Sequence, residues 1–376
     1  MPSPTILYNG RIYTLDPQQP FATAVAIQHG RVLAVGTDQD INHLHQPGGE
    51  KINLNGACVT PGLVDAHCHY QLYALSLRQV DLLEVPSLAE ALHRIQHKAA
   101  TLPAGEWLQG YGWKNQLWPE ARLPHKSDLD AILPHHPAIF NDKSYHTAWA
   151  NSRALQLAHI TRDTPNPEGG EIGRDEHGEP TGILYENAIK LVRQHIPDYT
   201  HDQLVESMQQ AQVNCWQAGL TGLHDFDGRS SFEALQTLHR NQQLGLRIYK
   251  NIPAALIDHA IALGLQTDFG DEWLRIGGIK IFADGALGGQ TALMVEPYEN
   301  APHNLGIAVT DKEEMHAIAS KASANGLSVT VHAIGDKAVH DILDVYEAVR
   351  GEEAARGDTR HLRHRIEHVQ IYHPQD

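Results

Sequence analysis

The sequence contains little cysteine, little positive charge and no long hydrophobic run, and each shortage excludes a class of protein. Its three cysteines are too few for a disulfide framework, so we expect a protein of the reducing cytoplasm. Apolar stretches stay below the roughly 18 residues that a membrane span requires. The first residues, "MPSPTILYNGRIYTLD", also lack the basic and then apolar pattern of a secretory signal peptide.

Acidic residues outnumber basic ones, 45 to 29, which gives a formal net charge of −16. Such a chain repels nucleic acid and anionic membranes, so we expect neither as a partner. Histidine is abundant, with 26 residues, and most of these must be ordinary surface or packing residues. A His-x-His spacing therefore predicts a metal site only where its context supports one.

Short apolar runs alternate with helical patterns along most of the chain. The runs cover residues 61–67, 219–226, 245–251, 275–285, 326–336 and 362–370. Alternation with short links predicts an α/β protein of parallel βαβ units. Each run becomes polar at its carboxyl end, where a (β/α)₈ barrel carries its active site. A doubly wound sheet also places ligands there, but no G-x-G-x-x-G follows the first run.

The regions outside these runs predict the domain organisation. Residues 1–60 contain short β-branched runs broken by Asn-Gly and His-Gly, which are hairpin signals, so we expect a small sheet layer there. The main domain would then span residues 61–376. Between its first two runs lies a long segment, residues 70–215, which predicts an inserted subdomain.

The first apolar run ends in His67 and His69. Residues i and i+2 of a strand share a face, so the two imidazoles project together, and imidazole binds Zn, Fe, Ni or Mn. Lys280 lies inside the apolar run "IGGIKIFADG", where an amine must shift its pKa, find a carboxylate or be modified. His332 and His368 end two further runs. Each residue alone has an ordinary structural explanation, but the five together predict one metal site at the strand ends.

These motifs resemble the amidohydrolase superfamily, and within it the YtcJ-like or N-substituted formamide deformylase branch. The resemblance runs nearly end to end and is carried by "TPGLVDAHCH", "GGIKIFADGALGGQTA", "VTVHAIGDKAV" and "HRIEHVQ". It implies a (β/α)₈ barrel of the TIM type, a small β-sandwich built from both chain ends, and one or two divalent metal ions, usually zinc. It also implies hydrolysis of a non-peptide C–N bond in a small-molecule amide by metal-activated water.

The resemblance further implies roles for individual residues. The implied metal ligands are His67, His69, Lys280, His332 and His368. Lys280 matches a lysine that carries a metal-bridging carbamate in many relatives. The candidates for catalysis are His332 and Asp284, with Asp225 as a support for the ligands. The candidates for substrate contact are Trp113, His146 and Gln290. Plain packing of Trp113 and a structural hydrogen bond of His146 remain open alternatives, as does a homodimer.

The sequence departs from the family pattern at its end and in its loops. We count six strands and find no aspartate of the eighth strand, which is the family's general base, so we expect an incomplete barrel. A fragment with poor hydrolytic activity by itself is therefore expected. The alternatives are a truncated or non-catalytic metal-binding remnant, and a histidine-rich transport or storage protein. Gln290 and Lys114 stand where relatives often have an arginine and an acid, respectively.

Overall fold

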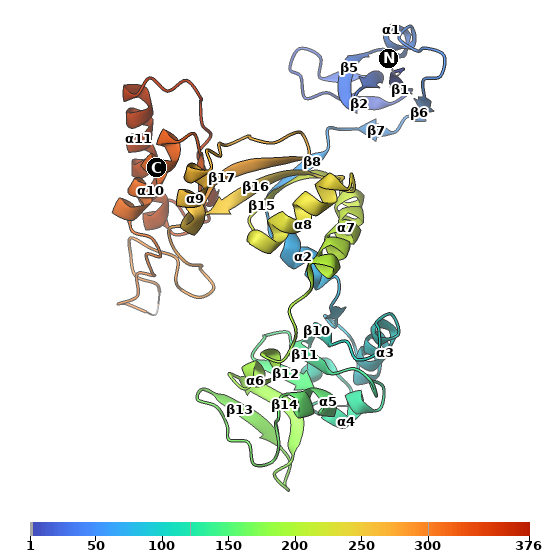
Figure 1. The fold of residues 1–376 in the computed structure, drawn as a ribbon, viewed down its shortest axis with the longest axis vertical. Coiled ribbons are helices and arrows are strands. Elements are labelled where there is room, and N and C mark those ends of the chain that lie inside the picture. The colour runs from blue at the N-terminus through green and yellow to red at the C-terminus, as the bar shows by residue number, and fades with distance from the viewer. Residues whose placement is uncertain (1–2, 121, 300) are drawn as a thin grey trace. The chain divides into compact units, whose positions relative to one another are not determined.

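The computed structural model describes residues 3–120, 122–299 and 301–376, and Figure 1 shows their helices and strands, coloured from the N-terminus to the C-terminus. The chain divides into two compact units. The first unit comprises Met1–Ala66 and Cys215–Leu223, and the second comprises His67–Asn214 and His224–Asp376.

The first unit contains two small sheets. One has the order β5-β4-β1-β6 and the other the order β3-β2-β7. The elements are β1 (Thr5–Tyr8), β2 (Arg11–Tyr13), β3 (Phe21–Ala22), β4 (Ala24–Gln28), β5 (Arg31–Gly36), α1 (Asp38–Asn42), β6 (Lys51–Asn53) and β7 (Cys58–Val59). The hairpin predicted at His29-Gly30 is confirmed, because β4 and β5 pair antiparallel across these two residues, which have φ values of 53° and 72°.

The hairpin predicted at Asn9-Gly10 is wrong. The strands on either side of it, β1 and β2, belong to different sheets. Asn9 binds the side chain of Asn53, and a Cβ on Gly10 would come within 2.4 Å of Leu54. The turn at residues 9–10 therefore connects the two sheets, and it lies next to residues 53–54.

Residues between the first two barrel strands form a sheet and two hydrophobic clusters of their own. The sheet has the order β13-β14-β12-β11-β10-β9. The elements are α2 (Tyr70–Ser76), β9 (Val80–Asp81), α3 (Leu88–Ala99), β10 (Leu108–Trp113), η1 (Asn115–Leu117), α4 (Lys126–Asp130), β11 (Ala138–Asp142), β12 (Thr147–Ala150), α5 (Ser152–Leu157), β13 (Gly170–Arg174), β14 (Pro180–Glu186), α6 (Ile189–Arg193) and α7 (His201–Gln217).

The six predicted barrel strands form one sheet of order β19-β18-β17-β16-β15-β8, so their order in the sheet follows their order along the chain. The pairs β16–β17, β17–β18 and β18–β19 are parallel. The elements are β8 (Leu63–Cys68), β15 (Leu220–Asp225), α8 (Arg229–Arg240), β16 (Arg247–Pro253), η2 (Ala254–Leu256), α9 (Ile257–Ala262), β17 (Leu274–Phe282), α10 (Lys312–Ala324), β18 (Val329–Ala333), α11 (Asp336–Ala355) and β19 (Arg365–His368). This confirms an α/β fold with a nearly closed, incomplete barrel of the TIM type.

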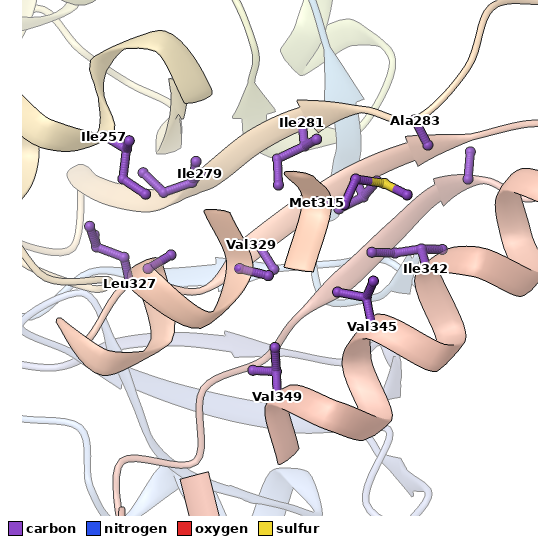
Figure 2. Close-up of a cluster of buried hydrophobic side chains, with 14 of the residues drawn as sticks. Ile257, Ile279, Ile281, Ala283, Met315, Leu327, Val329, Ile342, Val345 and Val349 are labelled. Atoms are coloured by element: carbon purple, nitrogen blue, oxygen red, sulfur yellow. The ribbon is translucent and has the colours of Figure 1, made fainter. Parts of the chain in front are cut away.

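Alternation along the strands decides which side chains face the site. Ile279 and Ile281 of β17, and Ala283 directly after it, pack in one cluster with residues of helices α10 and α11, as Figure 2 shows. The residues between them, Lys280 and Phe282, therefore project to the opposite face of the strand. The same rule places His332 on the inner face of β18, because Val329, Val331 and Ala333 belong to the same outer cluster.

Candidate metal centre

The carboxyl ends of β8, β18 and β19 bring the predicted histidines together. The ring of His368 lies 4.7 Å from that of His67 and 4.7 Å from that of His332, measured between centroids. The ring of His69 lies 5.6 Å from that of His67. These residues come from widely separated points in the chain, so only the strand order of the sheet makes them neighbours.

Three of these rings have one nitrogen fixed by a partner. His67 Nδ1 lies 2.7 Å from Glu367 Oε2, and His69 Nδ1 lies 3.0 Å from Asp227 Oδ1. A ring that donates Nδ1–H to a carboxylate has its lone pair on Nε2. His332 shows the reverse arrangement, because its Nε2 donates to the carbonyl of Gly285 at 2.8 Å, which places the lone pair on Nδ1. Partners of this kind orient metal-binding histidines.

Lys280 supplies a buried amine beside these rings. Its Nζ has no hydrogen-bond partner among the described residues and lies over the rings of Phe226 and Phe282, at 5.0 and 4.5 Å from their centroids. Phe226 in turn stacks on His67 at 4.1 Å. Burial lowers the pKa of Lys280 to about 8, although the nearby carboxylate of Glu367 opposes the change. The amine thus lies in surroundings that disfavour its charged form.

The same surroundings lower the pKa of two of the histidines, His368 and His332. Burial, followed by the positive charges of His332, His67 and Lys280, lowers the pKa of His368 to about 4. Burial also lowers the pKa of His332. Neutral imidazole is the form that binds a metal ion.

The types of side chain in this cluster suit a metal ion, but their present arrangement does not. Within residues 3–120, 122–299 and 301–376, no group of three or more His, Cys, Asp or Glu side chains is arranged so that it could hold one. The donor set nevertheless suits a divalent cation, because it combines oriented imidazoles with a buried amine that has no hydrogen-bond partner among the described residues. We therefore treat the cluster as a candidate metal centre.

Sequence reasoning missed three residues that support the cluster: Asp227, Lys250 and Glu367. Lys250, on β16, donates to Asp225 Oδ2 at 2.6 Å and to the carbonyl oxygen of Asp227. Asp227 also accepts from the backbone N–H of Gln71 at 2.6 Å. A signal for Lys250 was present, since "RIYKNIP" places a lysine in a mainly apolar strand, as "GGIKIF" does for Lys280.

The predicted supporting residue Asp225 is fully buried beneath this group. Its carboxylate accepts from the backbone N–H of Tyr70 at 3.1 Å and from Ser231 Oγ at 3.0 Å, in addition to Lys250. It therefore anchors the chain directly after His69.

Asp284, predicted to act in catalysis, is also buried, and its carboxylate holds backbone. It accepts from the N–H groups of Leu293, Ile334 and Gly335 at 2.8–3.0 Å, and one oxygen lies 3.5 Å from His332 Nε2. It thereby ties the loop after β17 to the turn before α11.

The three predicted substrate contacts lie in loops or in the segment between the first two barrel strands. Gln290 is exposed in the loop after β17, and its backbone carbonyl accepts from Asn304. Trp113 is buried and donates Nε1–H to the carbonyl of Phe140 at 2.8 Å. His146 is exposed and paired at 2.8 Å with Glu186, which raises the pKa of His146. Packing and a structural hydrogen bond are thus observed, and contact with substrate stays a prediction.

Among the described residues, no helix is both long and apolar enough to cross a membrane. The chain is 35% identical to Protein LONG AFTER FAR-RED 3 of Arabidopsis thaliana, over 98% of this chain and 64% of that protein. It is 33% identical to Putative amidohydrolase YtcJ of Bacillus subtilis (strain 168), over 91% and 65%.

Identity to N-substituted formamide deformylase of Arthrobacter pascens is 31%, over 93% of this chain and 67% of that protein. The chain thus spans about two thirds of the length of these curated relatives. An uncharacterized metal-dependent hydrolase from Pyrococcus furiosus superposes with a TM-score of 0.76 at 30% identity, over 99% of this chain and 74% of that one. A model of the amidohydrolase family matches residues 50–376, and the chain therefore belongs to that family.

Proposed function

We propose that this protein is a metal-dependent hydrolase that cleaves the C–N bond of a small-molecule amide or formamide. The observation that carries the proposal is the cluster at the strand ends, where oriented imidazoles adjoin the buried Nζ of Lys280, which has no hydrogen-bond partner among the described residues. The printed name of one relative, N-substituted formamide deformylase, supports this class of bond.

In this proposal the protein holds one or two divalent ions, which we expect to be zinc. The ligands would be His67, His69, Lys280, His332 and His368. A bound ion of this kind lowers the pKa of water and polarises a substrate carbonyl. Lys280 would act as a carbamate, because an amine with a pKa of about 8 is partly neutral near neutral pH. Its nitrogen then adds to carbon dioxide and releases one proton, leaving a bound anion.

The residues around the ligands would fix their orientation. Glu367 and Asp227 hold the Nδ1–H groups of His67 and His69, so the lone pairs stay on Nε2. For Asp284 we propose a positioning role beside His332 instead of proton transfer. Both of its oxygens already accept backbone N–H groups, so it keeps the loop after β17 in place.

Metal analysis of the purified chain tests the proposal, together with a panel of N-formyl and N-acyl amines assayed for release of amine. His332→Asn should lose most of the bound metal while remaining folded by circular dichroism. His361→Asn changes an exposed histidine and serves as the matched control. Equal metal loss in both variants would indicate scattered surface binding, as in a storage protein, and would overturn the proposal.

Metal binding without any release of amine would favour the alternative, a non-catalytic metal-binding member of the same fold. Intact mass under gentle conditions tests the carbamate, which should add about 44 Da and be lost on acidification.

We propose that the two N-terminal sheets belong to a β-sandwich and that residues 61–376 form the hydrolase domain. We further propose that the protein acts in the cytoplasm on a small-molecule amide, without nucleic acid or membrane. Whether it forms a homodimer is decided by its mass in solution.

A further inference from the structure

The sheet formed by β9, β10 and β11 has two chemically different faces. The three strands are parallel, and Gly110 and Tyr111 of β10 lie opposite Phe140 and Asn141 of β11. One face carries Leu108 and Phe140, which are buried in a hydrophobic cluster with α3. The other face carries Gln109, Tyr111 and Asn141 beside Ile139, which packs in a second hydrophobic cluster, so polar side chains make up most of a face that a covered sheet would fill with apolar ones.

A β-bulge at the carboxyl end of β10 changes the face to which the following side chain points. The register with β11 shifts between Tyr111 and Trp113, and Gly112 has a φ of 98°. Without the bulge, Tyr111 and Trp113 would share a face. With it, Trp113 turns into the hydrophobic cluster, and Tyr111 stays on the polar face. Bulges that redirect side chains in this way are frequent beside binding sites.

The polar face lines a cavity of about 400 Å³, which is within the size range of small-molecule sites. Asn141 is 8% exposed, and its Oδ1 has no hydrogen-bond partner among the described residues. A buried amide oxygen without a donor is destabilising, so this atom favours a ligand that offers an N–H or O–H group.

Arg193, at the end of α6, is the only Lys, Arg, Asp or Glu side chain among the residues that line this cavity. No Asp or Glu of the described ranges forms an ion pair with it. Most other arginines of residues 70–215 do have hydrogen-bond or ion-pair partners. A guanidinium in this setting matches the two oxygens of a carboxylate.

We propose that this cavity binds a small carboxylate that carries an amide N–H, such as an N-acyl amino acid. The carboxylate lies against Arg193, and the N–H donates to Asn141 Oδ1. Tyr111, Gln109 and Gln79 surround the remaining polar atoms of the ligand. The lining shares no residue with the candidate metal centre, so this site does not depend on the proposed hydrolytic function.

Titration calorimetry on the whole chain tests the site, with N-acetylglycine as the probe and a chelator present to remove metal. We expect one site per chain. N-acetylglycinamide, which lacks the carboxylate, and N-acetylsarcosine, which lacks the N–H, should each bind at least tenfold more weakly. Because the ligand is varied here, these comparisons do not depend on how a variant folds.

Arg193→Gln should weaken N-acetylglycine at least tenfold and remove the preference over N-acetylglycinamide. Arg153→Gln is the matched control, because Arg153 is an exposed arginine of the same segment outside the cavity, and it should bind like the parent. The absence of binding, or equal affinity for the acid and the amide, would overturn the proposal. So would binding that needs metal and is lost in His332→Asn. If the hydrolytic proposal fails instead, metal and amine release are missing while this binding persists.

Discussion

The buried ion pair of Lys250 and Asp225 should be the costliest single contact to break near the candidate site. Nζ and Oδ2 are 2.6 Å apart, and the two side chains are 4% and 0% exposed. Lys250→Met removes the ammonium group and leaves a buried carboxylate with only neutral donors, Tyr70 N–H and Ser231 Oγ. Removing one partner of such a pair costs about 3–5 kcal/mol of unfolding free energy.

A matched control separates burial from charge pairing. Arg229 and Glu233 are 2.7 Å apart but 83% and 46% exposed, so the distance is similar and the surroundings are not. Arg229→Met should cost far less unfolding free energy than Lys250→Met, because water screens the exposed pair. The double variant Lys250→Met/Asp225→Asn should recover about half of the loss, since it no longer buries an unpaired charge.

Urea unfolding, followed by far-ultraviolet circular dichroism and by tryptophan fluorescence, measures these differences where the two signals coincide. If Lys250→Met unfolds within about 0.5 kcal/mol of Arg229→Met, the buried pair does not carry the stability that its surroundings imply. A double variant no more stable than Lys250→Met would refute the explanation in terms of an unpaired carboxylate.

Glu367→Gln should weaken zinc binding about 10–100-fold in a competition titration, because it removes the carboxylate that holds His67 Nδ1–H, and unchanged affinity would contradict that role. Lys280→Met should raise the unfolding free energy of the metal-free chain by about 1–3 kcal/mol in urea, since the buried amine has no hydrogen-bond partner among the described residues; a loss of stability would show that the amine is satisfied. Burial lowers the pKa of His364 in the folded state. As the pH falls below about 6.5, His364 is therefore protonated in the unfolded state before it is protonated in the folded state. Stability is therefore present above that pH and is lost as the pH falls toward the folded pKa. His364→Gln should lose less unfolding free energy between about pH 7 and 5 than the parent, and an equal loss would exclude His364 as a source.

Local patterns in the sequence predicted two features of the structure well. Alternation in "IGGIKIFADG" was sufficient to place Lys280 opposite the apolar residues that pack under α10 and α11. Asn325 and Gly326 end α10, with Gly326 at a φ of 81°, as a helix stop of this type predicts. Both features depend on neighbours within a few residues, which a sequence shows directly.

The partners of the ligands could not be predicted in this way. The contact between His67 and Glu367 joins residues that are 300 positions apart. It depends on how close the edge strands β8 and β19 come, and no local pattern encodes that distance. Asn9-Gly10 failed for a related reason, because a turn signal shows that the chain reverses but not which strand it then pairs with.

The end of β19 shows how the backbone can override alternation at the site itself. Ile366 packs toward the outer cluster, so alternation sends Arg365 and Glu367 inward and His368 outward. His368 nevertheless lies against both His67 and His332, because its φ is 75° and that of Val369 is 46°. A left-handed conformation in residues other than glycine costs of order 1–3 kcal/mol and persists only where the surroundings hold it. It lets two consecutive residues serve one cluster, with Glu367 orienting His67 and His368 adding a further ring, so the strain lies where the candidate metal centre needs both groups.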